Sequence, residues 1–148
     1  LRFSPGLPDI AMRIASLCAL LSLFVVLFST TEVTSCYVKT NGCSIPGDLP
    51  FAYKATFKPA CDKHDVCYYC GRHYGWERDQ CDKAFQHDMK KVCDRFGGAK
   101  RWACKRIADV YYGSVRVGGA FFFKSPTQSW CKKTCAKNRG DPNKTLRG

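Results

Sequence analysis

The sequence lacks an apolar run long enough to cross a bilayer: the longest, at residues 17–28, has about a dozen residues, whereas a span needs roughly 20. Internal repeats and low-complexity tracts are absent as well. Acidic side chains are scarce, since 12 Asp and Glu face 24 Lys and Arg, and the net charge is +12. We therefore expect a soluble or peripheral protein whose partners carry negative charge.

The first 35 residues have the order of a signal peptide. Met12 and Arg13 open a weakly basic stretch, the apolar run follows, and residues 29–35 are small and polar. We expect cleavage just before Cys36 and secretion of the remainder to the extracellular space. Residues 1–11, which contain no initiator Met, are interpreted as translated upstream sequence.

Eleven cysteines occur, and only Cys18 falls in the predicted signal peptide. The even number that remains, in a secreted chain of this size, predicts a disulfide framework. We expect one domain at residues 36–137 and a polar, disordered tail at residues 138–148, which carries an N-glycosylation sequon at Asn143. A zinc module is disfavoured, because residues 67–70 hold the only CxxC pair.

The positive charge belongs to the predicted mature chain, because residues 1–35 contain two basic and two acidic side chains. Outside the cell the common polyanions are phospholipid head groups and sulfated glycans, so we expect an anionic membrane surface as partner and no nucleic acid. A glycan-binding protein and a merely solvated basic face are the alternatives, and no particular oligomeric state is predicted. The aromatic candidates for membrane contact are Trp76, Trp102, Trp130 and residues 121–123.

Hydrophobic periodicity predicts three helices. The first covers residues 60–71, after an ordered loop at residues 36–59, and the glycine at its end is the expected stop. The second covers residues 78–96, and the third starts at residue 99 or 100 and ends at residue 112, just before another glycine. Residues 114–124 are compatible with a short strand, a hairpin edge or an exposed hydrophobic patch.

An inward-facing carboxylate on the second helix is the first chemical signal. Asp82 precedes Phe85 by three residues and Met89 by seven, so it shares their apolar face. A buried charge needs a partner, and His64 on the first helix is the obvious one, with Tyr68 one turn later donating to the same carboxylate. An Asp that orients a His forms a general-base pair, which suits catalysis at neutral pH.

Asp65 points away from His64, because one step along a helix turns by about 100°. Its carboxylate is therefore better placed for a cation. Calcium takes several oxygen ligands, and the turn at Asn41 and Gly42 offers a side-chain amide oxygen and a backbone carbonyl. These three residues are the predicted metal site.

A His-Asp dipeptide on a helix is weak evidence by itself, since most such pairs are ordinary polar surface. The chain contains its own comparison, because His87 and Asp88 form a second pair. His87 points away from the apolar face and has no flanking cysteines, so we expect this pair to be solvated. His73, between the first two predicted helices, is interpreted as structural.

The stretch CDKHDVCY at residues 61–68 has the spacing CxxHDxCY and resembles the active-site signature of secreted phospholipases A2. Residues 84–93 are similar to the bacterial and fungal secreted enzymes, and the resemblance covers about residues 36–119. Four segments resemble the conodipine-type enzymes of cone-snail venom: residues 41–44, 57–61, 67–71 and 81–85.

The resemblance implies a mainly α, disulfide-rich fold with two antiparallel active-site helices, a third helix and an N-terminal calcium-binding loop. It implies a phospholipase A2 that uses Ca²⁺ to hydrolyse the sn-2 ester of glycerophospholipids into fatty acid and lysophospholipid. His64 corresponds to the general base, Asp82 to the residue that orients it and Tyr68 to its support. The alternative is a catalytically weak or inactive secreted toxin that binds a receptor or channel through its basic surface.

In the same comparison Asp65 corresponds to the calcium carboxylate, while Asn41 contributes its side chain and Gly42 its carbonyl. The bacterial pattern has Asp at the first loop position, and an uncharged amide there should weaken calcium binding. The resemblance also implies disulfides that join Cys43 to Cys61 and Cys93 to Cys104, which leaves 15 possible pairings for the other six cysteines.

Overall fold

The computed structural model describes residues 36–44, 52–123 and 127–146, and the predicted signal peptide lies outside this part of the chain. The described residues form helices and no β-strand. The elements are α2 (Lys54–Tyr74), α3 (Arg78–Cys93), α4 (Gly98–Gly118), α5 (Ala120–Phe123), the 3₁₀ helix η1 (Ser129–Lys132) and α6 (Thr134–Gly140). None of these helices combines the length and apolar character that a membrane span requires.

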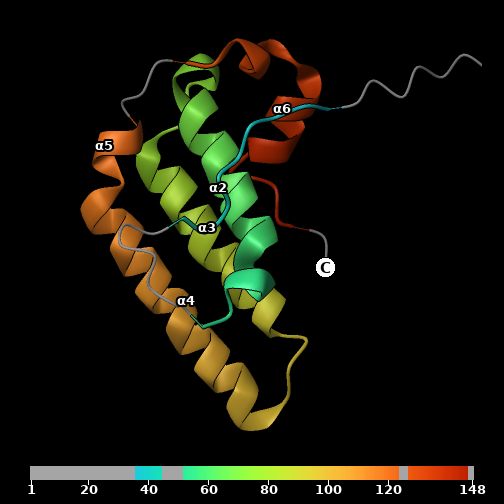
Figure 1. Cartoon of the computed structure of the whole chain (residues 1–148), viewed down its shortest axis with the longest axis vertical. Coiled ribbons are helices and arrows are strands. Elements are labelled where there is room, and N and C mark those ends of the chain that lie inside the picture. Colours follow the sequence, from blue (N-terminus) through green and yellow to red (C-terminus); the bar gives the residue numbers. More distant parts are fainter. Residues whose placement is uncertain (1–35, 45–51, 124–126, 147–148) are drawn as a thin grey trace, which may run out of the picture. The chain divides into compact units, whose positions relative to one another are not determined.

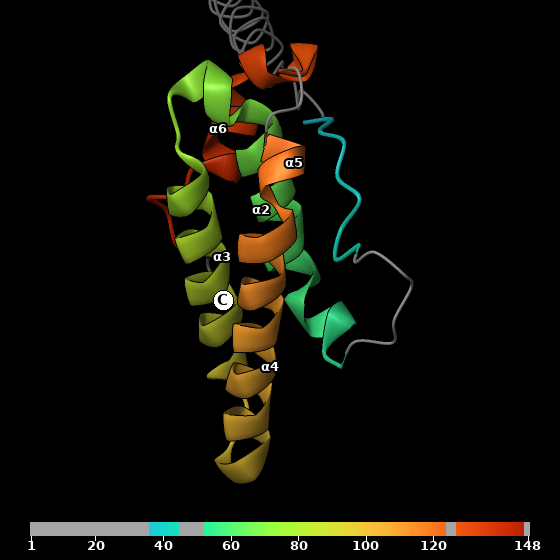
Figure 2. The same cartoon turned by 90° about the vertical axis from the view of Figure 1, so that its left-hand side faces the viewer.

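The three long helices lie side by side, with α3 packed against both α2 and α4 (Figure 1). The connection between α2 and α3 is short, so the two run antiparallel. The short α5 continues from α4 and packs against α2, and α6 covers another side of α2 (Figure 2). The predicted mainly α, disulfide-rich fold with two antiparallel helices is confirmed.

The first long helix starts earlier than predicted. α2 begins at Lys54 and passes through Pro59, so the last residues of the expected loop are helical. Phe57 explains why, because its ring is fully buried and meets that of Tyr111 edge-on at 5.3 Å. Burying such a side chain contributes about 1.5–3 kcal/mol, which offsets most of the roughly 3 kcal/mol cost of a proline inside a helix.

The expected stop at Gly71 is also wrong, since α2 continues to Tyr74 and ends at Gly75. Gly75 has φ of 69°, the left-handed conformation typical of a helix end, and its N–H donates to the Gly71 carbonyl. Gly71 has a packing role instead. A Cβ there would lie 2.7 Å from the ring of Phe123 in α5, so only glycine allows this close approach.

The second and third long helices differ from prediction at their ends. α3 begins at Arg78 as expected, with a capping box between Glu77 and Gln80, but it ends at Cys93. α4 continues through its internal glycine to Gly118. The chain beyond residue 113 is therefore helical to Phe123, and the predicted strand or hairpin edge is wrong there. The exposed-patch alternative agrees with Phe121 and Phe122, which are 89% and 60% exposed.

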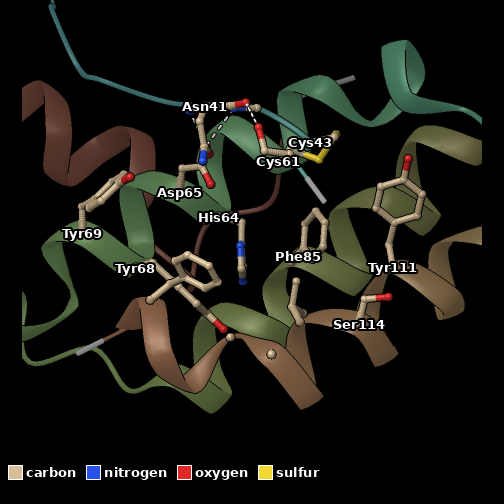
Figure 3. Close-up of a pocket in the computed structure, with 16 residues that line it drawn as sticks. Asn41, Cys43, Cys61, His64, Asp65, Tyr68, Tyr69, Phe85, Tyr111 and Ser114 are labelled. Carbon is tan, nitrogen blue, oxygen red and sulfur yellow. Dashed lines mark hydrogen bonds between the residues drawn. A yellow bond between two sulfur atoms is a disulfide. The ribbon is translucent and has the colours of Figure 1, made fainter. Parts of the chain in front are cut away.

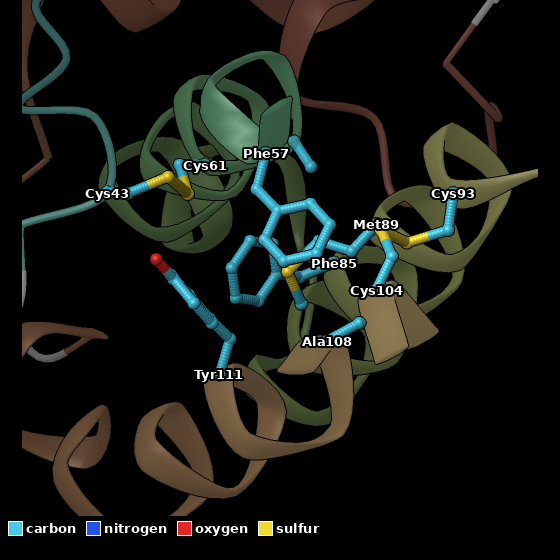
Figure 4. Packing of buried hydrophobic residues seen from close by; sticks show 10 residues of the cluster. Cys43, Phe57, Cys61, Phe85, Met89, Cys93, Cys104, Ala108 and Tyr111 are labelled. Atoms are coloured by element: carbon cyan, nitrogen blue, oxygen red, sulfur yellow. A yellow bond between two sulfur atoms is a disulfide. The ribbon is translucent and has the colours of Figure 1, made fainter. Parts of the chain in front are cut away.

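The main hydrophobic core lies where α2, α3 and α4 meet, around Phe57, Phe85 and Met89 (Figure 4). Two disulfides join the edges of this core, and they are the implied ones, Cys43–Cys61 and Cys93–Cys104. The other six cysteines pair as Cys36–Cys135, Cys67–Cys81 and Cys70–Cys131. Cys67–Cys81 joins α2 to α3, and Cys70–Cys131 joins α2 to η1.

The second His-Asp pair corrects one prediction. His87 is exposed as expected, but the Asp88 side chain is 1% exposed and lies 2.6 Å from the ammonium of Lys63. The chain after α6 covers this pair, because the Leu146 N–H donates to Asp88 at 3.0 Å and Lys63 donates to the Lys144 carbonyl. The tail predicted as disordered is therefore ordered up to Leu146.

Candidate active site

α2 and α3 bring the predicted catalytic side chains together. The Nε2 of His64 lies 3.0 Å from Oδ1 of Asp82, and the Tyr68 hydroxyl donates to the same oxygen at 2.5 Å. Asp82 is completely buried. The imidazole lies between two aromatic rings, with centroids 4.1 Å from Tyr68 and 4.6 Å from Phe85. Hydrogen bonds and packing therefore both restrict the orientation of His64.

Burial determines the protonation state of this group. Loss of solvent lowers the pKa of His64, although Asp82 partly opposes the shift, so the imidazole is neutral at neutral pH. A carboxylate can only accept, and Nε2 must therefore carry the proton that faces Asp82. The lone pair is left on Nδ1. Burial, reinforced by Asp82, also raises the pKa of Tyr68, which keeps its hydroxyl a donor.

The far side of Asp82 holds residues that sequence reasoning missed. Its Oδ2 lies 3.2 Å from Nη1 of Arg116 and 3.6 Å from Nη1 of Arg78. Arg78 is four residues before Asp82 on α3, and this spacing could have identified it. Arg116 arrives from α4, and no local pattern signals that contact.

The N-terminal loop meets α2 at Asp65 (Figure 3). Oδ2 of Asp65 accepts from the backbone N–H of Asn41 at 2.9 Å and from that of Gly42 at 3.0 Å. The Asn41 side-chain amide, assigned with its nitrogen toward Asp65, donates to the same oxygen at 2.7 Å. Gly42 has φ of 65°, and the Cys43–Cys61 disulfide holds the loop on the helix. The three predicted metal ligands are thus neighbours.

The chemistry of these neighbours fits a hard cation. Burial is the main reason that the pKa of Asp65 rises to about 7, and repulsion from Asp62 adds to the rise. A cation bound at this carboxylate would therefore stabilise its ionised form. Oδ1 of Asp62 is buried and has no hydrogen-bond partner among the described residues. No three His, Cys, Asp or Glu side chains form a metal cluster in the described part of the chain. A cation here would thus combine carboxylate with uncharged oxygens.

A mostly apolar pocket opens beside His64 and Asp65 (Figure 3). α4 and α5 supply its opposite wall with Tyr111, Val115 and Phe122 among other residues. The backbone at Gly119 approaches closely, because a Cβ there would overlap the Tyr68 hydroxyl. The pocket therefore places a neutral imidazole and a cation-compatible carboxylate next to an apolar wall.

Comparisons with known proteins show the family of this chain. A family model described as prokaryotic phospholipase A2 matches residues 19–119. Conodipine-P3 of Conus purpurascens is 49% identical over 63 residues, which are 43% of this chain and 34% of that protein. The conodipine-M alpha chain of Conus magus is 45% identical over 65 residues, 44% of this chain and 80% of that one.

A secretory phospholipase A2 of Arthroderma benhamiae is 33% identical over 91 residues, 57% of this chain and 60% of that protein. The match to conodipine-P3 spans only about a third of that protein. No solved structure matches the chain. The family model covers well over half of the sequence and includes both active-site helices. This chain therefore belongs to the prokaryotic phospholipase A2 family.

Proposed function

We propose that this protein is a secreted, calcium-dependent phospholipase A2 that hydrolyses the sn-2 ester of glycerophospholipids into fatty acid and lysophospholipid. The observation that carries the proposal is the neutral imidazole of His64, held by buried Asp82 at the edge of an apolar pocket. The family membership and the relative named a secretory phospholipase A2 support it.

His64 acts as the general base. Its Nδ1 takes a proton from a water molecule while the water oxygen bonds to the ester carbonyl carbon, and the same proton then passes to the departing glycerol oxygen. Asp82 stabilises the imidazolium that forms in between, and Tyr68 keeps that carboxylate in place. General-base assistance of this kind contributes about 10²- to 10⁴-fold to the rate.

Asp65, Asn41 and Gly42 would hold the calcium ion. When bound, it supplies Lewis-acid stabilisation of the negative charge on the ester oxygen and the phosphate. Asn41 would first have to turn its amide over, because its nitrogen now faces Asp65. The backbone N–H groups of the loop keep Asp65 oriented in the meantime.

The apolar wall of the pocket fits the acyl chain of the substrate. Phe85, Tyr111 and Val115 line it together with His64, so a chain beside them would bring its ester close to the imidazole. The alternative function, a basic toxin without activity, gives no role to a neutral His on a buried carboxylate.

Hydrolysis is expected when the oxidised, purified protein meets glycerophospholipid vesicles and calcium. The assay uses two substrates with the labelled acyl chain at sn-2 or at sn-1 and measures labelled fatty acid. Release from the sn-2 substrate alone is the expected result. Absence of release from both would contradict the enzymatic proposal and favour the toxin, and equal release from both would contradict the positional specificity.

We also propose an anionic phospholipid membrane as the binding partner, contacted through the apolar face of α4 and α5. This face comprises Trp102, Val110, Val117, Phe121 and Phe122, all of them exposed. The three α4 residues are spaced by eight and seven positions and so lie on one side of the helix. Phe122 also lines the pocket, which connects the face to the site of hydrolysis. The net charge of +12 favours an anionic surface.

The double variant Val117→Ser/Phe121→Ser is expected to weaken vesicle binding by about tenfold or more, because full burial of one such side chain is worth about 1.5–3 kcal/mol. Both side chains are 89% exposed, so the fold should not change. Binding is measured by sedimentation with anionic vesicles of ether-linked phospholipid, which cannot be hydrolysed. Tyr37→Ser, at a 67% exposed position, is the control. Equal binding by the double variant and the wild type would refute this contact face.

A further inference from the structure

Asp82 is a buried carboxylate whose countercharge is not the catalytic His. It is completely inaccessible to solvent, and an uncompensated charge there would cost several kcal/mol. His64 cannot supply the positive charge at rest, because an imidazole must be neutral to take a proton. Tyr68, the other partner of Oδ1, is also neutral. The negative charge of Asp82 must therefore be compensated by a cationic group beside its other oxygen, Oδ2.

Arg116 is the strongest source of that compensation. Its Nη1 donates to Oδ2 of Asp82 at 3.2 Å and to Oδ1 of Asp79 at 3.0 Å. Arg78 is farther away, at 3.6 Å, and uses the same nitrogen to donate to the carbonyls of Val115 and Arg116. Arginine keeps its charge at every pH at which the protein folds. Asp79, one turn before Asp82, accepts from the same nitrogen and thereby helps to hold the guanidinium.

We propose that Arg116 is a positioning residue for hydrolysis: its guanidinium holds Oδ2 of Asp82, so that Oδ1 faces His64 and Tyr68. This inference rests on the proposed function. The two oxygens of Asp82 then have different partners. Oδ2 is bound by the guanidinium of Arg116 from α4, and Oδ1 remains available to the imidazole of His64. Arg116 thereby contributes to catalysis without itself lining the pocket.

Loss of Arg116 should affect turnover and not substrate affinity. Neither Arg116 nor Asp79 lines the pocket, so the substrate makes no contact with them. Without the guanidinium, Oδ2 of Asp82 would lose its nearest cationic partner, and the carboxylate would be free to turn. The imidazole of His64 would then lose the hydrogen bond to Oδ1 that orients it.

Arg116→Gln is tested against Arg116→Lys, which keeps the charge, and against Arg106→Gln, which removes an exposed arginine from the same helix. A short-chain phospholipid below its aggregation concentration separates kcat from membrane binding. We expect Arg116→Gln to lower kcat about tenfold to hundredfold, within the roughly 10²- to 10⁴-fold worth of a general base, with KM within about twofold. Arg116→Lys should recover part of kcat, and Arg106→Gln should equal the wild type.

A second readout does not depend on activity. Nitrogen NMR of the His64 ring at neutral pH should show the proton on Nε2 alone in the wild type and a mixture of the two neutral tautomers in Arg116→Gln. If the wild type has no esterase activity, the proposed function fails while this spectrum still decides the role of Arg116.

A folded Arg116→Gln protein with wild-type kcat and wild-type ring signals would overturn the inference. Should that variant not fold, Asp79→Asn replaces it, because Asp79 is 42% exposed and holds the same guanidinium. Asp79→Asn is expected to lower kcat less than Arg116→Gln does and to shift the ring signals in the same direction. Unchanged kcat and ring signals in Asp79→Asn would then overturn the inference.

Discussion

His64→Gln is expected to abolish measurable ester hydrolysis while the protein stays folded. Glutamine can still donate an N–H to Asp82, so the buried carboxylate keeps a partner, but an amide cannot take a proton from water. The loss should reach at least the roughly 10²- to 10⁴-fold that a general base contributes. Fatty-acid release from sn-2-labelled vesicles measures the effect, and circular dichroism checks the helices.

The second His-Asp pair supplies a matched control. His87 also precedes an aspartate on a long helix, but its side chain is 62% exposed and lies 3.8 Å from Asp88. His87→Gln should therefore retain wild-type activity. If His64→Gln kept more than about a tenth of the wild-type rate, another group would have to be the base, and the mechanism would be wrong.

Asp65→Asn is expected to remove calcium binding and, with it, nearly all hydrolysis. The substitution deletes the only charge among the three proposed ligands, and a hard divalent cation binds uncharged amide oxygens far more weakly. The fold should survive, because an Asn side-chain oxygen can still accept from the N–H groups of Asn41 and Gly42. Calorimetric titration with calcium measures binding directly, and hydrolysis is followed as a function of calcium concentration.

Removal of the metal provides an independent arm of this test. A chelator should abolish hydrolysis by the wild-type protein, and added calcium should restore hydrolysis. Asp94→Asn, at an exposed carboxylate paired with Lys105, is the charge-matched control and should titrate like the wild type. Hydrolysis that persists in chelator would refute calcium dependence, and unchanged calcium binding by Asp65→Asn would refute this ligand.

The interior of the fold followed from helical periodicity, while several element ends did not. The inward position of Asp82 was predictable because Phe85 and Met89 mark the buried face of the same helix. The start of α2 was not, because Pro59 favours a loop locally and only the distant contact between Phe57 and Tyr111 outweighs it. Tertiary packing decided that boundary.

The same distinction applies to charges. His64 and Asp82 could be paired from sequence because each lies on a recognisable helix face. Asp88 was assigned to the surface, because its partners Lys63 and Leu146 come from other parts of the chain. Arg116 was missed for the same reason, since it meets Asp82 from 34 positions away. Contacts between separate elements leave no periodic trace in a single sequence.

The Cys43–Cys61 disulfide makes the proposed calcium loop depend on the redox state of its surroundings. In a reducing cytosol those two thiols would stay apart, and the loop that carries Asn41 and Gly42 would lose its covalent attachment to α2. The proposed site would then assemble only after entry into an oxidising compartment.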